Sequence, residues 1–96
     1  MRRTETLHIG DVLNEFFSRP YVAAKVAEGR LPDTWREVVG DAIANQTSQI
    51  RLVRGTLYVH VQSSIVRSEL MMRRLALCQA INNRSRVPIV KSVIVK

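Results

Sequence analysis

The residue types that most often carry out catalysis are few and scattered in this sequence. His8 and His60 fall in different expected elements, and neither has a Cys, Asp or Glu at a spacing that binds a metal. The only cysteine, Cys78, has no partner for an internal disulfide or a paired-cysteine zinc site. The serine pair at 63–64 has no nearby base and is typical of a helix cap. We therefore expect no catalytic residue, no metal, no cofactor and no small-molecule substrate, so the chain is not expected to be an enzyme.

Basic residues are the informative chemical group. Residues 1–50 hold six basic and seven acidic side chains, whereas residues 51–96 hold nine basic ones and a single acid, Glu69. Most of the basic residues are arginines, whose planar group can hold a phosphate through two hydrogen bonds. A small domain with one strongly basic half indicates a polyanionic partner, most often nucleic acid. A merely solvated basic face, or an acidic protein partner, remains the alternative.

The basic residues fall in three expected elements: a β-hairpin, a long helix and the return into a last strand. If the open face of the sheet carries Arg51, Tyr58 and His60, it offers cations beside an aromatic ring, which is how single strands are held. With one aromatic ring, such binding would be mostly electrostatic and strongly dependent on salt. The candidate nucleic-acid-binding residues are Arg51, Arg54, Tyr58, His60, Arg67, Arg73, Arg74, Arg84, Arg86 and Lys91.

The first half of the sequence has helical periodicity. We predict helices over Thr6–Ser18 and Pro20–Glu28, the first ended by the proline and the second by a glycine. A third helix is expected to start at 31–34 and to run past Gly40, which suggests a close approach to another element. Thr34 and Glu37 have the spacing of a capping box for it, with Asp33 as the alternative cap.

The second half changes to strand alternation. Apolar residues alternate with polar ones at 49–52 and at 57–62, and Arg54-Gly55 between them predicts a hairpin turn. A long helix should follow from the serine pair to about Asn82-Asn83, and Ile89–Val95 should form a third strand. The expected fold class is α+β: amino-terminal helices followed by β-β-α-β, with a small three-stranded sheet packed on helices on one face.

The long helix has two apolar faces. Val66, Leu70, Leu77 and Ile81 form one of them, as expected for a core-facing side. A second stripe lies on roughly the opposite side and is either covered by the amino-terminal helices or free to bind a protein partner, since methionines recur at interfaces. The candidate partner-binding residues are Met71, Met72 and Leu75.

The length of the chain, 96 residues, fits one domain, and no linker or repeat divides it, so residues 1–96 are predicted to form a single domain. No stretch approaches the apolar length of a membrane span, and the first residues lack the apolar centre of a signal peptide. We expect a soluble cytoplasmic protein with no membrane contact.

Several motifs, taken in order, resemble those of the DciA-like family. The segment Trp35-Arg36-Glu37-Val38-Val39-Gly40, with Ile43-Ala44 and Thr47, resembles its W-x-x-V-V-G…I-A…T signature. The segment 55–61 is similar to its G-x-L-x-V-x-V strand, the segment 63–70 to its S-S-x-x-x-x-E-L helix opening, and Ile81-Asn82 to its later I/L-N pair. One departure is a valine at position 66, where many members carry tryptophan. The sequence also lacks the G-x-x-G loop with which true K-homology domains clamp a nucleic-acid backbone.

The resemblance implies a K-homology-like fold and an accessory role in bacterial DNA replication. It implies binding to the replicative DNA helicase and to single-stranded DNA, with assistance to helicase loading. Two alternatives stay open: a protein-only adaptor whose basic half binds an acidic partner, and an RNA-binding K-homology-like module. The family gives no residue assignment here, so the candidate sites rest on charge and pattern.

Overall fold

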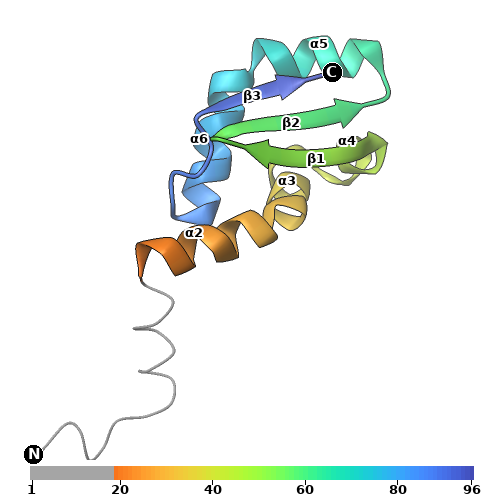
Figure 1. Cartoon of the computed structure of the whole chain (residues 1–96). Coiled ribbons are helices and arrows are strands. Elements are labelled where there is room, and N and C mark those ends of the chain that lie inside the picture. The colour runs from red at the N-terminus through yellow and green to blue at the C-terminus, as the bar shows by residue number, and fades with distance from the viewer. Residues whose placement is uncertain (1–18) are drawn as a thin grey trace, which may run out of the picture.

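A computed structural model describes residues 19–96, so the helix predicted over Thr6–Ser18 lies outside the described residues. In the described part, three helices precede a β-hairpin, and two further helices lead into a last strand (Figure 1). The elements are α2 (Pro20–Gly29), α3 (Leu31–Val39), α4 (Asp41–Gln46), β1 (Thr47–Val53), β2 (Thr56–Val61), α5 (Ser64–Met72), α6 (Arg74–Ser85) and β3 (Ser92–Val95).

The third helix begins within the predicted range of 31–34, but its predicted cap and its predicted course past Gly40 are wrong. Helix α3 begins at Leu31 after the cap residue Arg30, and no side chain caps it, so Thr34 and Asp33 lie inside the helix. Pro32 explains a start at Leu31, because a proline without an N–H suits the first helical turn. The helix ends at Gly40, whose φ of 91° and ψ of 164° separate it from α4. Gly40 meets no close neighbour, so it serves the backbone turn and not a close approach.

The sheet has the order β1-β2-β3, with β1 antiparallel and β3 parallel to β2. The hairpin predicted at Arg54-Gly55 is confirmed, since both residues have positive φ, 51° and 84°. Two central residues in this conformation are typical of the turn whose twist matches paired strands.

The long helix predicted after the serine pair is wrong, because the chain breaks at Arg73 into α5 and α6. Ser63 caps α5 as expected, its Oγ accepting the N–H of Val66 at 3.3 Å. The two helices pack on different partners: α5 contacts β2 and β3, whereas α6 contacts α3 and β3. The break lets α5 lie along β2 and α6 lie along α3 while both helices contact β3.

The last strand is shorter than predicted, starting at Ser92 and not at Ile89. Asn82 explains the difference, because its side-chain amide binds both the N–H and the carbonyl of Val90. Its Oδ1 accepts the N–H of Val90 at 2.9 Å, and its Nδ2 donates to the carbonyl of Val90 at 2.8 Å. Val90 is therefore held by α6 and not by the sheet.

The helices cover one face of the sheet. Leu57, Val59 and Val61 of β2 are fully buried, with Trp35 and Ile81 among the helical side chains packed on them. The indole N–H of Trp35 donates to Thr47 Oγ1 at 3.0 Å, which ties α3 to the start of β1. The predicted class, an α+β arrangement of helices followed by a small three-stranded sheet, is confirmed.

Candidate nucleic-acid interface

The face of the sheet turned away from the helices is open to solvent. In β2, Tyr58 is half-buried and His60 is exposed, although their neighbours along the strand are fully buried. Strand register brings Arg51 of β1 opposite Tyr58, and Ile94 of β3 opposite it on the other side. This alternation places Arg51, Tyr58 and His60 together on the open face, which is the arrangement considered in the sequence analysis.

Two cations flank the ring of Tyr58. Arg51 Cζ lies 6.0 Å and Lys96 Nζ lies 5.2 Å from the ring centroid, both at cation–π distance. A hollow of about 150 Å³ opens beside the ring, and its polar lining can donate hydrogen bonds and attract an anion. Its lining residues are Gln49, Arg51, Tyr58, Val59, His60 and Lys96.

Two further predicted residues lie at the hairpin end of the sheet. Arg54 is an exposed turn residue, and Lys91 lies against the turn, with its side chain packed over Gly55 and its N–H donating to the carbonyl of Gly55. A side chain at Gly55 would come within about 3.0 Å of the Lys91 stem, so glycine is needed there for space as well as for its positive φ.

The predicted arginines of α5 and α6 differ in how free their side chains are. Arg67 Nη1 donates to the carbonyls of Val61 and Gln62 at 2.8 and 3.0 Å, so it holds the end of β2. Arg74 Nη1 donates to the carbonyl of Met71 at 3.1 Å, within the break between the helices. Arg73 is exposed at the same break.

The remaining two predicted arginines line a different surface. Arg84 forms an ion pair with Glu37 at 3.2 Å, and Arg86 ends α6; both border a groove between α6 and α2. The structure therefore brings Arg51, Tyr58 and His60 together and separates Arg84 and Arg86 from them.

Sequence reasoning missed Lys96 and Gln49, which complete the lining beside Tyr58. Gln49 follows from strand alternation, since it lies two residues from Arg51. Lys96 follows from the same alternation only when β3 is known to run parallel beside β2, and no local motif carries that pairing.

The partner-binding candidates also divide. Met71 is half-buried, and its Sδ accepts the N–H of Val95 at 3.2 Å, so it closes the edge of β3. Met72 and Leu75 are 78% and 75% exposed, so the described helices leave them uncovered. Ile65, which sequence reasoning missed, is 75% exposed on α5 and lies two helical turns from Met72 on the same side.

Other chemistry is sparse in this part of the chain. Residues 19–96 contain no group of three or more His, Cys, Asp or Glu side chains placed to hold a metal. Cys78 is half-buried, and its thiol donates to the carbonyl of Val90 at 2.9 Å, a packing contact. None of the helices among these residues has the length and apolar character needed to cross a membrane.

Comparison with known families gives a match over most of the chain. Residues 8–95 match the family model described as Dna[CI] antecedent, DciA. No curated protein and no solved structure matches the chain. The match spans nearly the whole sequence, including the tryptophan, strand and serine motifs described above. The chain therefore belongs to the DciA family, whose members are accessory proteins with a role related to helicase loading in bacterial DNA replication.

Proposed function

We propose that the chain is a non-enzymatic accessory protein that binds single-stranded DNA and the replicative DNA helicase and thereby assists helicase loading in the bacterial cytoplasm. The observation that supports DNA binding is the ring of Tyr58 between Arg51 and Lys96 on the open face of the sheet. A base can stack on an aromatic ring while neighbouring cations neutralise phosphates. A single ring gives little sequence preference and makes the contribution of charge large.

The helicase would bind elsewhere, at the exposed apolar side chains of α5 and α6. Ile65, Met72 and Leu75 are each at least 75% exposed, and apolar side chains left in water are typical of protein contact surfaces. Arg73 lies between Met72 and Leu75 in the sequence and adds a cation to this surface. Two separate surfaces would allow the helicase and the strand to bind at once.

DNA binding is tested by fluorescence anisotropy of a labelled single strand, titrated with the full chain at several salt concentrations. Duplex DNA and RNA of equal length serve as competitors. We expect affinity to fall steeply with salt and single-stranded DNA to compete best. Better competition by RNA would favour the RNA-binding alternative, because the 2′-hydroxyl is what separates the two strands chemically. No binding at low salt would leave the protein-only adaptor.

Helicase binding is tested by titrating the replicative helicase with the chain carrying Met72→Asp and Leu75→Asp. Asn83→Asp, which adds a carboxylate at an exposed position two helical turns beyond Leu75 on α6, is the control. Loss of helicase binding in the double variant alone supports the assignment. Equal binding by the parent chain, the double variant and the control would show that the helicase does not bind the α5–α6 surface. That result would leave the proposed DNA-binding site unchanged.

A further inference from the structure

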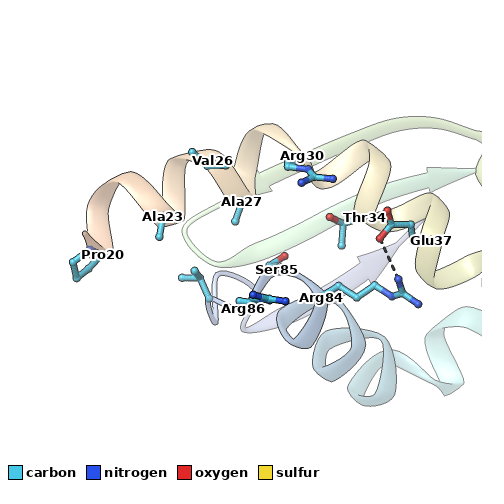
Figure 2. Close-up of a pocket in the computed structure, with 11 residues that line it drawn as sticks. Pro20, Ala23, Val26, Ala27, Arg30, Thr34, Glu37, Arg84, Ser85 and Arg86 are labelled. Carbon is cyan, nitrogen blue, oxygen red and sulfur yellow. Dashed lines mark hydrogen bonds and ion pairs between the residues drawn. The ribbon is translucent and has the colours of Figure 1, made fainter. Parts of the chain in front are cut away.

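A groove runs between α2 and the carboxyl end of α6, away from the hollow beside Tyr58. Its volume is about 700 Å³, and none of its lining residues belongs to the sheet (Figure 2). Figure 2 shows Ala23 and Ala27 of α2 pointing toward Ser85 and Arg86 at the end of α6. The α2 side extends over about 15 Å from Pro20 to Arg30, at 1.5 Å per helical residue.

The side of the groove formed by α2 carries small apolar side chains, because residues three and four apart lie on one side of a helix. Ala23, Ala27 and Arg30 lie four and then three residues apart, so they share one side of the helix. The small alanine side chains leave room between the two helices, and Val26 and Val87 add further apolar surface. An occupant must therefore present an apolar ridge.

The borders of the groove are cationic. Arg30 and Arg86 are exposed, and no carboxylate within residues 19–96 forms an ion pair with either. The ion pair between Arg84 and Glu37 lies at the α3 end of the groove. Two unpaired arginines beside an apolar wall are complementary to an apolar segment that carries acidic side chains.

Arg86 occupies a backbone position that does not suit it. Its φ of 60° and ψ of 9° are left-handed, a conformation that glycine adopts without steric cost at the end of a helix. An arginine here places a cation at the groove against the preference of the backbone. The hydroxyl of Ser85, buried beside it, also has no hydrogen-bond partner in the described part of the chain.

We propose that this groove binds an acidic amphipathic helix of a partner protein, with apolar side chains against Ala23 and Val87 and carboxylates beside Arg30 and Arg86. Helix-in-groove binding uses this combination of an apolar stripe and flanking charge. Nucleic acid fits less well, because the groove has an apolar wall and no aromatic side chain for stacking. The inference is independent of the proposed function, since it uses neither the sheet face nor the α5–α6 surface.

The test uses the full chain and a labelled 14-residue synthetic helix, with leucines spaced three and four apart and glutamates on both flanks. We expect binding in fluorescence anisotropy that weakens with salt. A second peptide with glutamine in place of every glutamate should bind roughly tenfold more weakly, as should a third with serine in place of the leucines. Equal binding of the first two peptides would overturn the charge argument.

Variants then locate the site. Ala23→Glu places a carboxylate in the groove and should reduce peptide affinity at least tenfold. Ala24→Glu, the same change one residue along α2 and outside the groove lining, is the matched control. Arg86→Gly should weaken binding about threefold to fivefold while the melting temperature stays the same or rises, which separates lost binding from lost folding.

Three results with these variants would also overturn the proposal. The first is an equal loss of peptide binding in Ala23→Glu and Ala24→Glu. The second is a loss of single-stranded DNA binding in Ala23→Glu but not in Ala24→Glu, which would assign the groove to nucleic acid. The third is a dimer in sedimentation velocity that Ala23→Glu alone dissociates, which would assign the groove to a second copy of the chain. In each case the sheet-face variants still test the proposed function separately.

Discussion

Replacement of Tyr58 by alanine tests the open face of the sheet most directly. One base stacked on an aromatic side chain contributes about 1–3 kcal/mol, so Tyr58→Ala should weaken single-strand binding roughly 5-fold to 150-fold. Tyr58→Phe keeps the ring and should stay within about twofold of the parent. Tyr21 is the matched control, since it is 72% exposed and also lies near a cation, with Lys25 Nζ 5.7 Å from its ring.

The two cations beside Tyr58 allow a second, independent prediction, which concerns the salt dependence of DNA binding. Each phosphate neutralised on a single strand contributes about 0.7 to the slope of log affinity against log salt. The double change Arg51→Gln and Lys96→Gln should therefore reduce that slope by about 1.4. Arg84→Gln, which removes a cation already paired with Glu37, should leave the slope nearly unchanged.

The assay is fluorescence anisotropy of a labelled single strand at four or more salt concentrations, with melting temperatures recorded for every variant. Tyr58→Ala and Tyr21→Ala with equal affinities would refute the stacking argument. A slope that falls as much in Arg84→Gln as in the double variant would refute the assignment of the phosphates to the sheet face. Binding would then follow overall charge and not a site.

Three substitutions test how the fold is built, each by urea denaturation. Asn82→Ala leaves the N–H of Val90 without its partner, while the carbonyl keeps only the thiol of Cys78, and should lower the free energy of unfolding by about 1–3 kcal/mol; no change would mean that water replaces the amide. Gly40→Ala meets no close atom, so its expected cost of about 1–3 kcal/mol is that of the backbone conformation alone, and a neutral result would contradict the positive φ. Arg86→Gly should raise the free energy of unfolding by about 1 kcal/mol, because glycine removes the left-handed strain; a loss of stability would show that the arginine supports the fold.

Local patterns in the sequence predicted most of the elements because each has a local cause. Strand alternation over 57–62 predicts that Tyr58 and His60 lie on one face of the strand and Leu57 and Val59 on the other. The structure confirms this division, since the second pair is fully buried. Arg54-Gly55 has the turn chemistry that a hairpin requires, and Ser63 caps the helix that it was expected to cap. These features depend on neighbours within a few residues.

The wrong predictions in the second half of the chain have a different cause, since they depend on packing against other elements. The break at Arg73 has no glycine or proline to announce it, and it follows from the different elements against which α5 and α6 pack. Asparagine is a residue type that often ends a helix, but α6 continues past Asn82. The amide of Asn82 instead binds Val90, eight residues later in the sequence. The K-homology-like label also stays a prediction.

The candidate site shows the same limit. Lys96 is an isolated lysine in the sequence, and only the parallel pairing of β3 with β2 brings it to the ring of Tyr58. Lys91, a candidate nucleic-acid-binding residue, lies beside the hairpin turn and is not among the residues that line the hollow. A site that spans three strands cannot be assembled from alternation alone, because alternation assigns a face but not a neighbour.

The apolar residues of α5 and α6 show why sequence reasoning confuses a core with an interface. Burial of a large apolar side chain stabilises a fold by about 1.5–3 kcal/mol, and contact with a partner uses the same interaction. A stripe of apolar side chains such as Met71, Met72 and Leu75 is therefore equally typical of a core and of an interface. The structure divides it, since Met71 closes the edge of β3 while Met72 and Leu75 remain exposed. Met71 is explained by the fold, whereas Met72 and Leu75 contribute little to it, and binding to another protein is the function that would account for them.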